Sequence, residues 1–266
     1  MCRHLAYLGP PVTLAALLLD PPHGLLHQSY APADMRGGGT VNADGFGAGW
    51  YPSAADSAPE TAPVPPARYR SDRPIWGDTA FAALAAVTPA AGVLAAVRSA
   101  TPGLPVTTAA AAPFAEGPWL FSHNGVVRGW PGAVADLAGR LPVTDLLTLD
   151  APTDSAVLWA LARHRLRAGD DPADVLAGVV CAVAAAAPGS RLNLLLTDGT
   201  TIWATTWTHA LSVRVGGGAV TVASEPSDAG SGWVAVPDRH LVVATPRGCE
   251  VRSLDTGAPA AGIAAA

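Results

Sequence analysis

The order of the predicted elements constrains the fold of this chain more than any other feature of its sequence. Strand-like segments dominate the first third and the last third, and helical segments fill the middle. Residues 192–197 and 200–207 are two apolar strands joined by Asp198-Gly199, a strong hairpin signal. Strands on both sides of a run of helices favour two antiparallel sheets packed face to face, with helices outside them.

Local signals place the helices and the ends of the strands. Asp78 is a candidate N-cap for an Ala-rich helix that ends near residue 87. Thr153 or Asp154 can cap a helix to about residue 167, and Asp171-Pro172 is typical of the start of the next one. With no internal repeat and no clear linker, we expect one α+β domain over residues 1–266.

Two strands each lead into a polar cluster. Residues 92–97 are predicted to end at an Arg-Ser-Ala-Thr-Pro-Gly segment, and residues 119–122 at His123-Asn124-Gly125. Polar loops at the ends of neighbouring strands commonly hold active sites. Two further segments are predicted from their prolines. Pro10-Pro11 predicts the end of a strand over residues 2–8, and residues 52–66 indicate a surface loop.

Composition excludes several classes of protein. Half of the 266 residues are hydrophobic and only 14% are charged, so a well-buried core is expected. A net charge of −5 with scattered arginines argues against a nucleic-acid partner. No signal peptide opens the chain and no apolar run is long enough to cross a bilayer, so we expect a cytoplasmic protein without a membrane partner.

Familiar cofactor and metal motifs can be set aside. The glycines of residues 45–49 lead into Trp50-Tyr51-Pro52 instead of a helix, so they indicate a strand that another segment approaches closely. His23 and His27 stand four residues apart, but Pro21-Pro22 disfavours a helix there and no third ligand is near. Neither a Gly-x-Ser-x-Gly elbow nor a phosphate loop occurs, and we expect no metal and no cofactor.

Cys2 is the strongest candidate for a nucleophile. If Met1 is removed, this residue carries a thiol and a free α-amine. The unperturbed pKa values of these two kinds of group are about 8.5 and about 7.7–8.0. Cys2 then supplies both the attacking sulfur and a base near neutral pH. The alternative is an ordinary small residue close to a start codon. Cys181 and Cys249 are too distant to suggest a disulfide framework, and we interpret Cys181 as structural.

Several segments resemble, in the same order, the class II glutamine amidotransferase family. They are Met1-Cys2-Arg3, residues 42–50, residues 98–103, His123-Asn124-Gly125, Thr153-Asp154-Ser155 and Ser224-Glu225-Pro226. Members of this family are N-terminal-nucleophile hydrolases with a four-layer αββα fold, so the resemblance implies that fold here. The opening ten residues and residues 41–47 are most similar to the branch that removes glutamate from γ-glutamyl-hercynylcysteine sulfoxide in ergothioneine biosynthesis.

The resemblance also implies roles for individual residues. Cys2 matches the nucleophile that forms a thioester with the γ-glutamyl carbonyl carbon. Asn124 and Gly125 match the oxyanion hole. Arg98 matches the partner of the glutamyl α-carboxylate, with Thr101 as a supporting polar contact, and Asp154 matches the acceptor for the α-ammonium group. Without the resemblance, Arg98 could equally be a structural ion-pair residue and Asp154 a helix cap.

Two departures bear on the substrate. Pro102 stands where many glutamine-using members have histidine, and Ala156 stands where glutamate is common. Three hypotheses therefore remain: an amidohydrolase of the ergothioneine branch that needs no synthase partner, a glutaminase subunit or broader γ-glutamyl amidase, and a catalytically silent γ-glutamyl-binding protein. For the first, a quaternary ammonium in the leaving group predicts an aromatic wall built partly from Tyr30, Trp50, Tyr51 and Trp76, with structural packing as the alternative.

Overall fold

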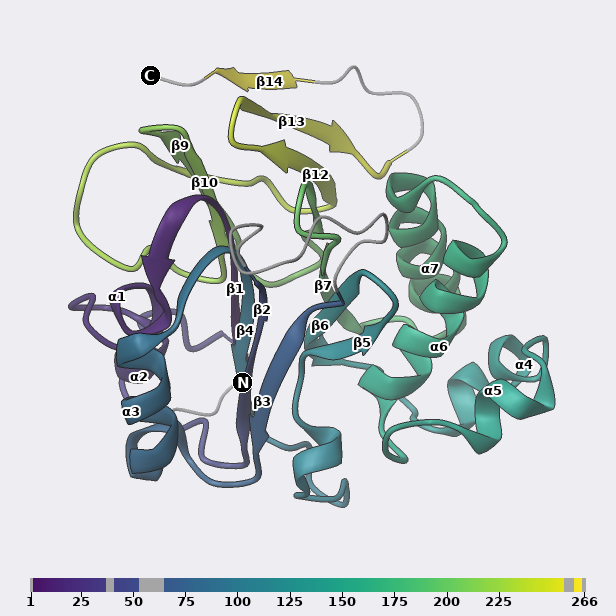
Figure 1. The fold of residues 1–266 in the computed structure, drawn as a ribbon. Helices are drawn as coiled ribbons and strands as arrows, with labels where there is room; N and C mark the ends of the chain where they lie inside the picture. The colour runs from purple at the N-terminus through teal and green to yellow at the C-terminus, as the bar shows by residue number, and fades with distance from the viewer. Residues whose placement is uncertain (1, 37–40, 53–64, 256–260, 265–266) are drawn as a thin grey trace.

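The computed structural model describes residues 2–36, 41–52, 65–255 and 261–264, and its strands form two sheets packed face to face (Figure 1). In the first sheet the order is β11 (Trp233–Ala235), β9 (Ser212–Gly216), β10 (Ala219–Ala223), β1 (Arg3–Thr13), β4 (Pro89–Val97), β2 (Phe46–Tyr51) and β3 (Ala67–Ser71). The first strand of the chain is therefore the central strand of this sheet.

The second sheet is built mainly from the last third of the chain. Its order is β14 (Ala261–Ala264), β13 (Gly248–Ser253), β12 (His240–Thr245), β8 (Ile202–Thr205), β7 (Arg191–Thr197), β6 (Trp119–Val126) and β5 (Phe114–Glu116). All the pairings described in both sheets are antiparallel. This arrangement confirms the prediction of two antiparallel sheets.

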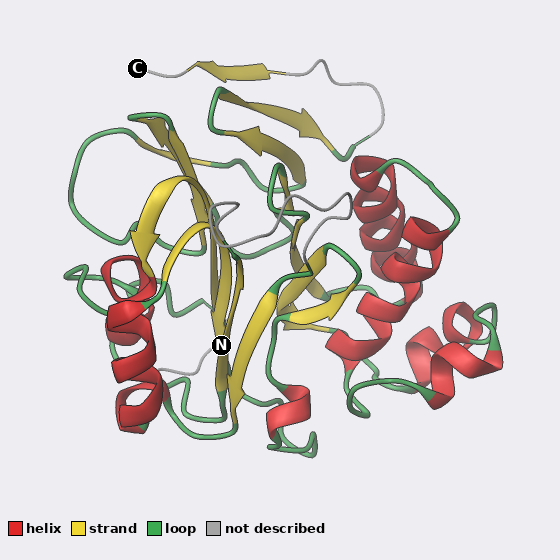
Figure 2. Ribbon diagram, in the orientation of Figure 1, coloured by secondary structure: helices red, strands yellow, loops and turns green. Residues whose placement is uncertain are grey.

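Helices cover the outer face of each sheet (Figure 2). On the first sheet lie α1 (Leu14–Leu18), α2 (Leu25–Gln28) and α3 (Thr79–Val87), and on the second lie α6 (Asp154–Arg167) and α7 (Pro172–Ala186). The short helices α4 (Ala135–Ala138) and α5 (Val143–Leu147) lie outside α6. Short 3₁₀ helices occupy Ile75–Gly77, Thr108–Ala110 and Gly132–Val134.

The predicted helix starts are confirmed by their capping contacts. The Asp78 carboxylate accepts a hydrogen bond from the Phe81 N–H at 2.9 Å, and the Thr153 hydroxyl accepts one from the Ala156 N–H at 3.2 Å. Asp171 accepts from Ala173 N–H at the start of α7. Each cap satisfies a backbone donor that the first helical turn leaves without a partner.

Alternation along the strands divides the interior into three apolar layers. In β1, Ala6 and Leu8 face the second sheet, whereas Leu5 and Tyr7 face α1–α3. In β7, Leu195 lies between the sheets, while Leu194 and its i±2 neighbours pack under α6 and α7. Because successive strand residues point to opposite faces, each sheet buries both faces. The αββα sandwich implied by the resemblance is confirmed.

Strand β2 confirms the interpretation of its glycines. A Cβ on Gly47 would lie 2.4 Å from the Ala112 carbonyl oxygen, and one on Gly49 would lie 2.8 Å from the Leu120 side chain. Neither space accepts a side chain, so the alternating glycines let β2 pack closely against neighbouring chain segments.

Two sequence predictions need correction, and one falls mostly outside the described residues. Strand β1 does not end before Pro10-Pro11 but continues to Thr13, because its register against β4 shifts between Leu8 and Val12 and accommodates the prolines at a bulge. His123-Asn124-Gly125 lies inside β6 and not beyond its end. Of the predicted loop over residues 52–66, residues 53–64 are outside the described residues.

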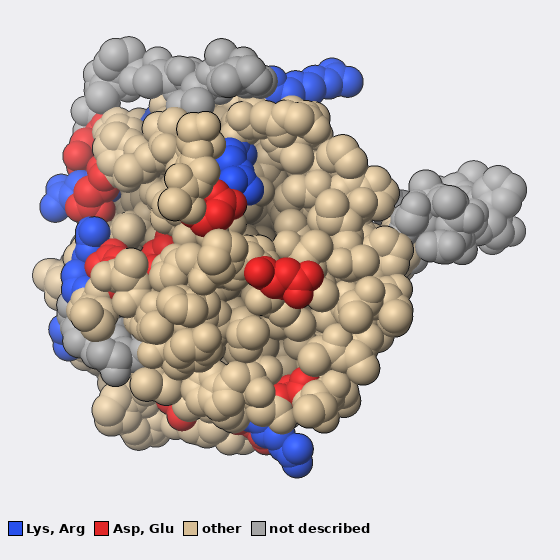
Figure 3. Space-filling view, turned by 90° about the vertical axis from the view of Figure 1, so that its left-hand side faces the viewer, with Lys and Arg blue, Asp and Glu red and all other residues tan. Residues whose placement is uncertain are grey.

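The surface over α1–α3 carries few charges. Figure 3 views the molecule from this side, and most of the face has neither basic nor acidic side chains. Within the described part of the chain, no helix is long and apolar enough to cross a membrane.

Candidate active site

The pairing of β1 with β4 places Cys2 next to Arg98. Arg3 pairs with Val97 in this antiparallel ladder, so the residue before Arg3 lies opposite the residue after Val97. Cys2 is partly exposed, and its thiol is 3.6 Å from the Ser99 carbonyl oxygen. Cys2 and Arg98 line the same small hollow, about 20 Å³ in volume, together with His123 and Ser155. That volume suits one water molecule.

The Arg98 side chain is held by backbone carbonyls. Its Nη1 donates to the Pro105 oxygen at 2.9 Å and to the Asp44 oxygen at 3.4 Å. Asp44 fixes the same turn from the other side, because its carboxylate accepts from the Ala100 N–H at 2.8 Å. Neutral carbonyls do not cancel the guanidinium charge, so Arg98 presents a positive charge beside Cys2 that can attract a carboxylate.

Thr101 lies in the turn that follows Arg98. Its carbonyl accepts a hydrogen bond from the Leu104 N–H at 3.0 Å, and it is half-buried. Thr101 is not among the residues that line the hollow, and neither are the two departures from the family pattern, Pro102 and Ala156. The structure therefore brings Arg98 to the nucleophile but not Thr101.

Asn124 points from β6 into the space between the sheets, toward β1 and β10. Its Nδ2 donates to the Ser224 hydroxyl oxygen at 3.2 Å, and the same oxygen accepts from the His4 N–H at 3.0 Å. An amide nitrogen carries two hydrogens, so this contact leaves one of them for another acceptor. The Asn124 Oδ1 is buried and has no hydrogen-bond partner among the described residues.

Gly125 occupies a position that only glycine fits. A Cβ there would lie 1.8 Å from the Arg191 carbonyl oxygen and 2.6 Å from the His123 ring. Real Cβ atoms do not approach backbone atoms so closely, so any side chain would push β6 away from β7.

Asp154 joins the start of α6 to the end of β6. Its Oδ2 accepts from the Val127 N–H at 3.0 Å, and its Oδ1 accepts from the Ser155 N–H at 2.8 Å. The side chain is buried. Asp154 is thus neither a plain N-cap, a role that Thr153 fills, nor among the residues lining the hollow, although its neighbour Ser155 is.

His123 is a residue of the hollow to which the sequence analysis gave no role. Its Nε2 lies 3.0 Å from the Arg191 carbonyl oxygen, which can only accept, so Nε2 carries the proton. Its Nδ1 then accepts from the Ser155 hydroxyl at 3.0 Å. Burial lowers the pKa of His123 even though the Asp154 charge opposes this shift, so the ring is neutral. The signal was its position directly before Asn124 in the sequence.

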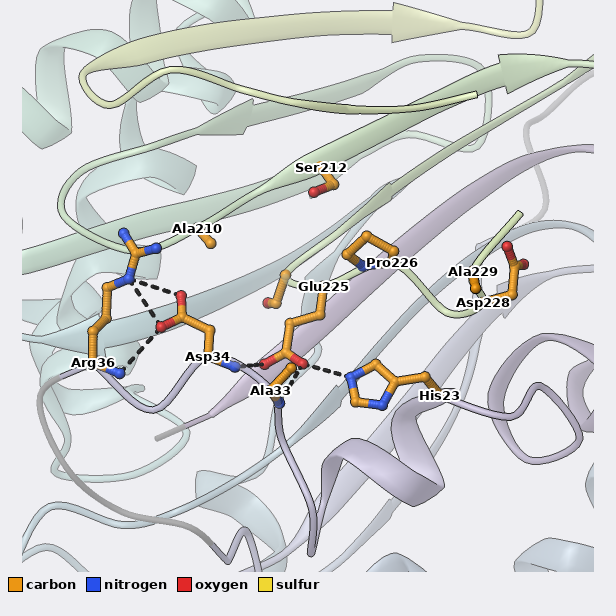
Figure 4. A pocket seen from close by; sticks show the side chains of 11 residues that line it. His23, Ala33, Asp34, Arg36, Ala210, Ser212, Glu225, Pro226, Asp228 and Ala229 are labelled. Carbon is orange, nitrogen blue, oxygen red and sulfur yellow. Dashed lines mark hydrogen bonds and ion pairs between the residues drawn. The ribbon is translucent and has the colours of Figure 1, made fainter. Parts of the chain in front are cut away.

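A second group of polar residues surrounds the first residues of β1. Glu225 continues the β1–β10 ladder and is opposite Arg3, and their side chains form an ion pair with Arg3 Nε 2.5 Å from Glu225 Oε1. Glu225 lines a recess of about 670 Å³. Figure 4 shows its side chain between those of Asp34 and His23. The sequence analysis missed this pair, because 222 positions separate its members.

Two other predictions concerned a histidine pair and an aromatic wall. His23 and His27 contact each other through their Nδ1 atoms at 3.1 Å, and the described residues contain no cluster of three or more side chains suited to a metal. Of the proposed aromatic wall, Tyr51 pairs with Gly92, far along β2 from the Cys2 end, and its hydroxyl donates to the Thr197 carbonyl. Tyr30 and Trp76 are half-exposed and contact each other edge to face.

Comparison with solved structures defines the class. The chain superposes on a glutamine aminotransferase class-II domain protein from Silicibacter pomeroyi with a TM-score of 0.66 and 24% identity, over 97% of this chain and 100% of that one. It also superposes on the glutamine phosphoribosylpyrophosphate amidotransferase of B. subtilis with a TM-score of 0.65 and 14% identity, over 96% of this chain and 50% of that one. The fold is that of the class II glutamine amidotransferases.

Comparison of sequences is more specific. The chain is 43% identical over 242 residues, 91% of its length, to γ-glutamyl-hercynylcysteine sulfoxide hydrolase of Mycolicibacterium smegmatis, of which it covers 95%. It is 41% identical over 256 residues, 96% of its length, to the Mycobacterium tuberculosis protein of the same name, of which it covers 97%. The chain belongs to the γ-glutamyl-hercynylcysteine sulfoxide hydrolase family. No protein-family model matches the sequence.

Proposed function

We propose that this protein hydrolyses the γ-glutamyl amide bond of γ-glutamyl-hercynylcysteine sulfoxide and releases glutamate and hercynylcysteine sulfoxide. The observation that carries the proposal is the position of Cys2 at the start of β1, opposite Arg98, in a chain that is 43% identical to a hydrolase of that name. We expect it to act in the cytoplasm without a synthase partner.

The proposed reaction has two steps. With Met1 removed, the Cys2 α-amine takes the thiol proton and the sulfur attacks the γ-carbonyl carbon. The C–N bond then breaks, the amine leaves with a proton and a thioester remains. A water molecule adds to the thioester, the C–S bond breaks, and glutamate leaves as the thiol is restored. Atoms balance with one water consumed per amide bond, and no redox partner is needed.

Three contacts support the assignment of the binding residues. Arg98 carries a charge that carbonyl contacts leave uncancelled, and this charge suits the glutamyl α-carboxylate. Asn124 has a second amide hydrogen free for the oxyanion, because Ser224 takes only one. Asp154 is a buried carboxylate next to Ser155, which lines the hollow, and we assign Asp154 to the α-ammonium group. Thr101 keeps its proposed supporting role only if the turn after Arg98 moves.

The size of the hollow adds a requirement. A volume of about 20 Å³ does not hold a glutamyl group, so its walls must move apart when the substrate binds. The turn after β4, which includes Ser99 and Thr101, is partly exposed and is held by few side-chain contacts. We assign the movement to this turn.

The test is a comparison of substrates on protein whose intact mass confirms a free Cys2. Glutamine, glutathione and γ-glutamyl-hercynylcysteine sulfoxide are supplied at equal concentrations, and glutamate release is followed, with Cys2→Ala as the control. Strong preference for the sulfoxide is expected. Equal or faster hydrolysis of glutamine would replace the proposal with a glutaminase, and no release from any of the three would indicate a silent γ-glutamyl-binding protein.

A further inference from the structure

The side chain of Arg3 is buried and links three parts of the chain. Its Nε contacts Glu225 Oε1 at 2.5 Å, its Nη1 donates to the Cys2 carbonyl oxygen at 2.9 Å, and its Nη2 donates to the Asp34 carbonyl oxygen. One guanidinium group therefore ties the peptide carbonyl of Cys2 both to the neighbouring strand and to the segment that precedes β2. The planar fork of arginine allows these contacts at once.

Glu225 holds Arg3 in place and is itself fully engaged. Its Oε1 also accepts from the Asp34 N–H at 3.1 Å, and its Oε2 accepts from the Ala33 N–H at 2.9 Å and from His23 Nε2 at 2.6 Å. Burial opposes ionisation, but the hydrogen bonds from His23 and Ala33 and the charge of Arg3 outweigh it, so the pKa of Glu225 lies below its usual range. The carboxylate is therefore charged at neutral pH and cannot turn without breaking several contacts.

A nucleophile at the start of a chain needs such an anchor. Once it is the first residue, Cys2 has no preceding peptide bond to fix its orientation, and its carbonyl belongs to its one remaining peptide group. Chain ends that nothing ties down lose order. The thiol has one described hydrogen bond, to the Ser99 carbonyl at 3.6 Å, which is a weak contact for sulfur. The Arg3 contact with the Cys2 carbonyl is shorter and charge-assisted.

We propose that Arg3 and Glu225 are positioning residues, which hold the Cys2 peptide group so that its thiol stays aligned in the hollow. This inference rests on the proposed role of Cys2 as the nucleophile. Loss of the pair would release the first residues of β1 and leave the remainder of the sheet intact, because the β1–β4 ladder continues from Leu5 to Leu8.

The three cysteines allow a test within one molecule. Cys181 is exposed and serves as the reference for reagent activity, whereas Cys249 is buried, with its pKa raised by burial to about 11, and reports global unfolding. Wild type, Glu225→Gln and Arg3→Lys are treated with iodoacetamide, and labelling at each cysteine is followed by peptide mass spectrometry. In both variants we expect labelling of Cys2 relative to Cys181 to rise about threefold or more, with Cys249 as protected as in wild type.

Turnover should fall in the same two variants, Glu225→Gln and Arg3→Lys. With the substrate that wild type cleaves best, kcat should fall by about tenfold to a hundredfold while KM stays within about twofold, because alignment and not binding is lost. The matched control is Asp145→Asn, which removes another buried carboxylate paired with arginines, in the helical layer. It should leave Cys2 labelling and kcat unchanged.

Two results would overturn the inference. One is Cys2 labelling in Glu225→Gln and Arg3→Lys that equals wild type. The other is labelling of Cys249 together with Cys2, which would make the pair merely structural; Arg3→Lys is the gentler change if Glu225→Gln does not fold. Labelling needs no substrate, so wild type that releases no glutamate would refute the proposed function while the labelling ratios still decide the role of the pair.

Discussion

At Gly125 a single hydrogen atom decides whether two strands can meet. Because an added methyl group would lie 1.8 Å from the Arg191 carbonyl oxygen, Gly125→Ala should force β6 away from β7. Displacing Asn124 by even an ångström should lower turnover about a hundredfold, and overpacking should cost about 1–3 kcal/mol of stability. Glutamate release and urea unfolding measure the two effects.

The control for this variant is Gly132→Ala, since no atom lies within 4 Å of the Cβ position there. It should retain both turnover and stability. Wild-type turnover in Gly125→Ala would mean that the backbone of β6 has no part in the reaction.

Two buried histidines predict how stability depends on pH. His209 accepts a hydrogen bond from Arg191 Nε at 2.9 Å, and burial together with the charges of Arg191 and Arg3 lowers its pKa to about 3. Burial also lowers the pKa of His4 to about 3. The unfolded chain binds protons at these positions below about pH 6.5, whereas the folded chain does so only near pH 3. Stability should therefore be complete above pH 6.5 and fall as the pH drops toward 3.

His209→Gln tests this dependence, because glutamine can accept from Arg191 but does not titrate. Between pH 6.5 and 5, each histidine should account for about 2 kcal/mol of the loss in unfolding free energy. Urea unfolding at the two pH values should show a smaller loss in His209→Gln than in wild type. An identical loss in both proteins would assign the pH dependence to other groups.

Among the elements, helix α6 carries Asp154 and Ser155 on its first turn, so its N-cap should influence the site. Thr153→Ala removes the hydroxyl that accepts from the Ala156 N–H and should cost about 1 kcal/mol of stability. Because the first turn then loosens, KM should rise severalfold while kcat changes less.

Asp171→Ala is the matched control, since it removes the equivalent cap from α7. It should lower the unfolding free energy by a similar amount without changing KM. If both variants changed KM equally, the cap of α6 would have no special relation to substrate binding.

Local signals were enough to predict most elements of the fold. The caps at Asp78, Thr153 and Asp171 are short-range patterns, and the structure confirms each of them. The hairpin at Asp198-Gly199 was predicted, but its turn is longer than two residues, because residues 198–201 join β7 to β8. The three-residue strands β5 and β11 were missed, since so few residues hold no periodicity.

The features of the site that the sequence did not predict depend on contacts between residues far apart in the chain. Arg98 was predicted beside Cys2 from a resemblance, and the strand register supports this. The Arg3–Glu225 pair and the contact of His123 with Arg191 join distant segments, which no local pattern specifies. The single domain over residues 1–266 stays a prediction, and so do the roles of all the site residues: Cys2, Arg98, Thr101, Asn124, Gly125 and Asp154.

For the molecule as a whole, the two ends of the chain lie in different places. Strand β1 starts in the middle of the first sheet, beside the hollow, whereas β14 is the outermost strand of the second sheet (Figure 1). A tag before Cys2, or retained Met1, blocks the α-amine and should abolish turnover, and a tag after residue 266 should not. Intact mass spectrometry with glutamate release checks this. Full activity in protein whose mass includes Met1 would refute the α-amine as the base.

The central place of β1 also orders events during synthesis. Its first neighbour, β4, follows within the first hundred residues, but its second neighbour, β10, comes from residues 219–223. Until the ribosome has made most of the chain, one edge of the strand stays open and its N-terminus remains within reach of processing enzymes. Pairing across such a separation is slow and leaves unpaired edges exposed. We therefore expect the first residues of the nascent chain to stay accessible until β10 has been made.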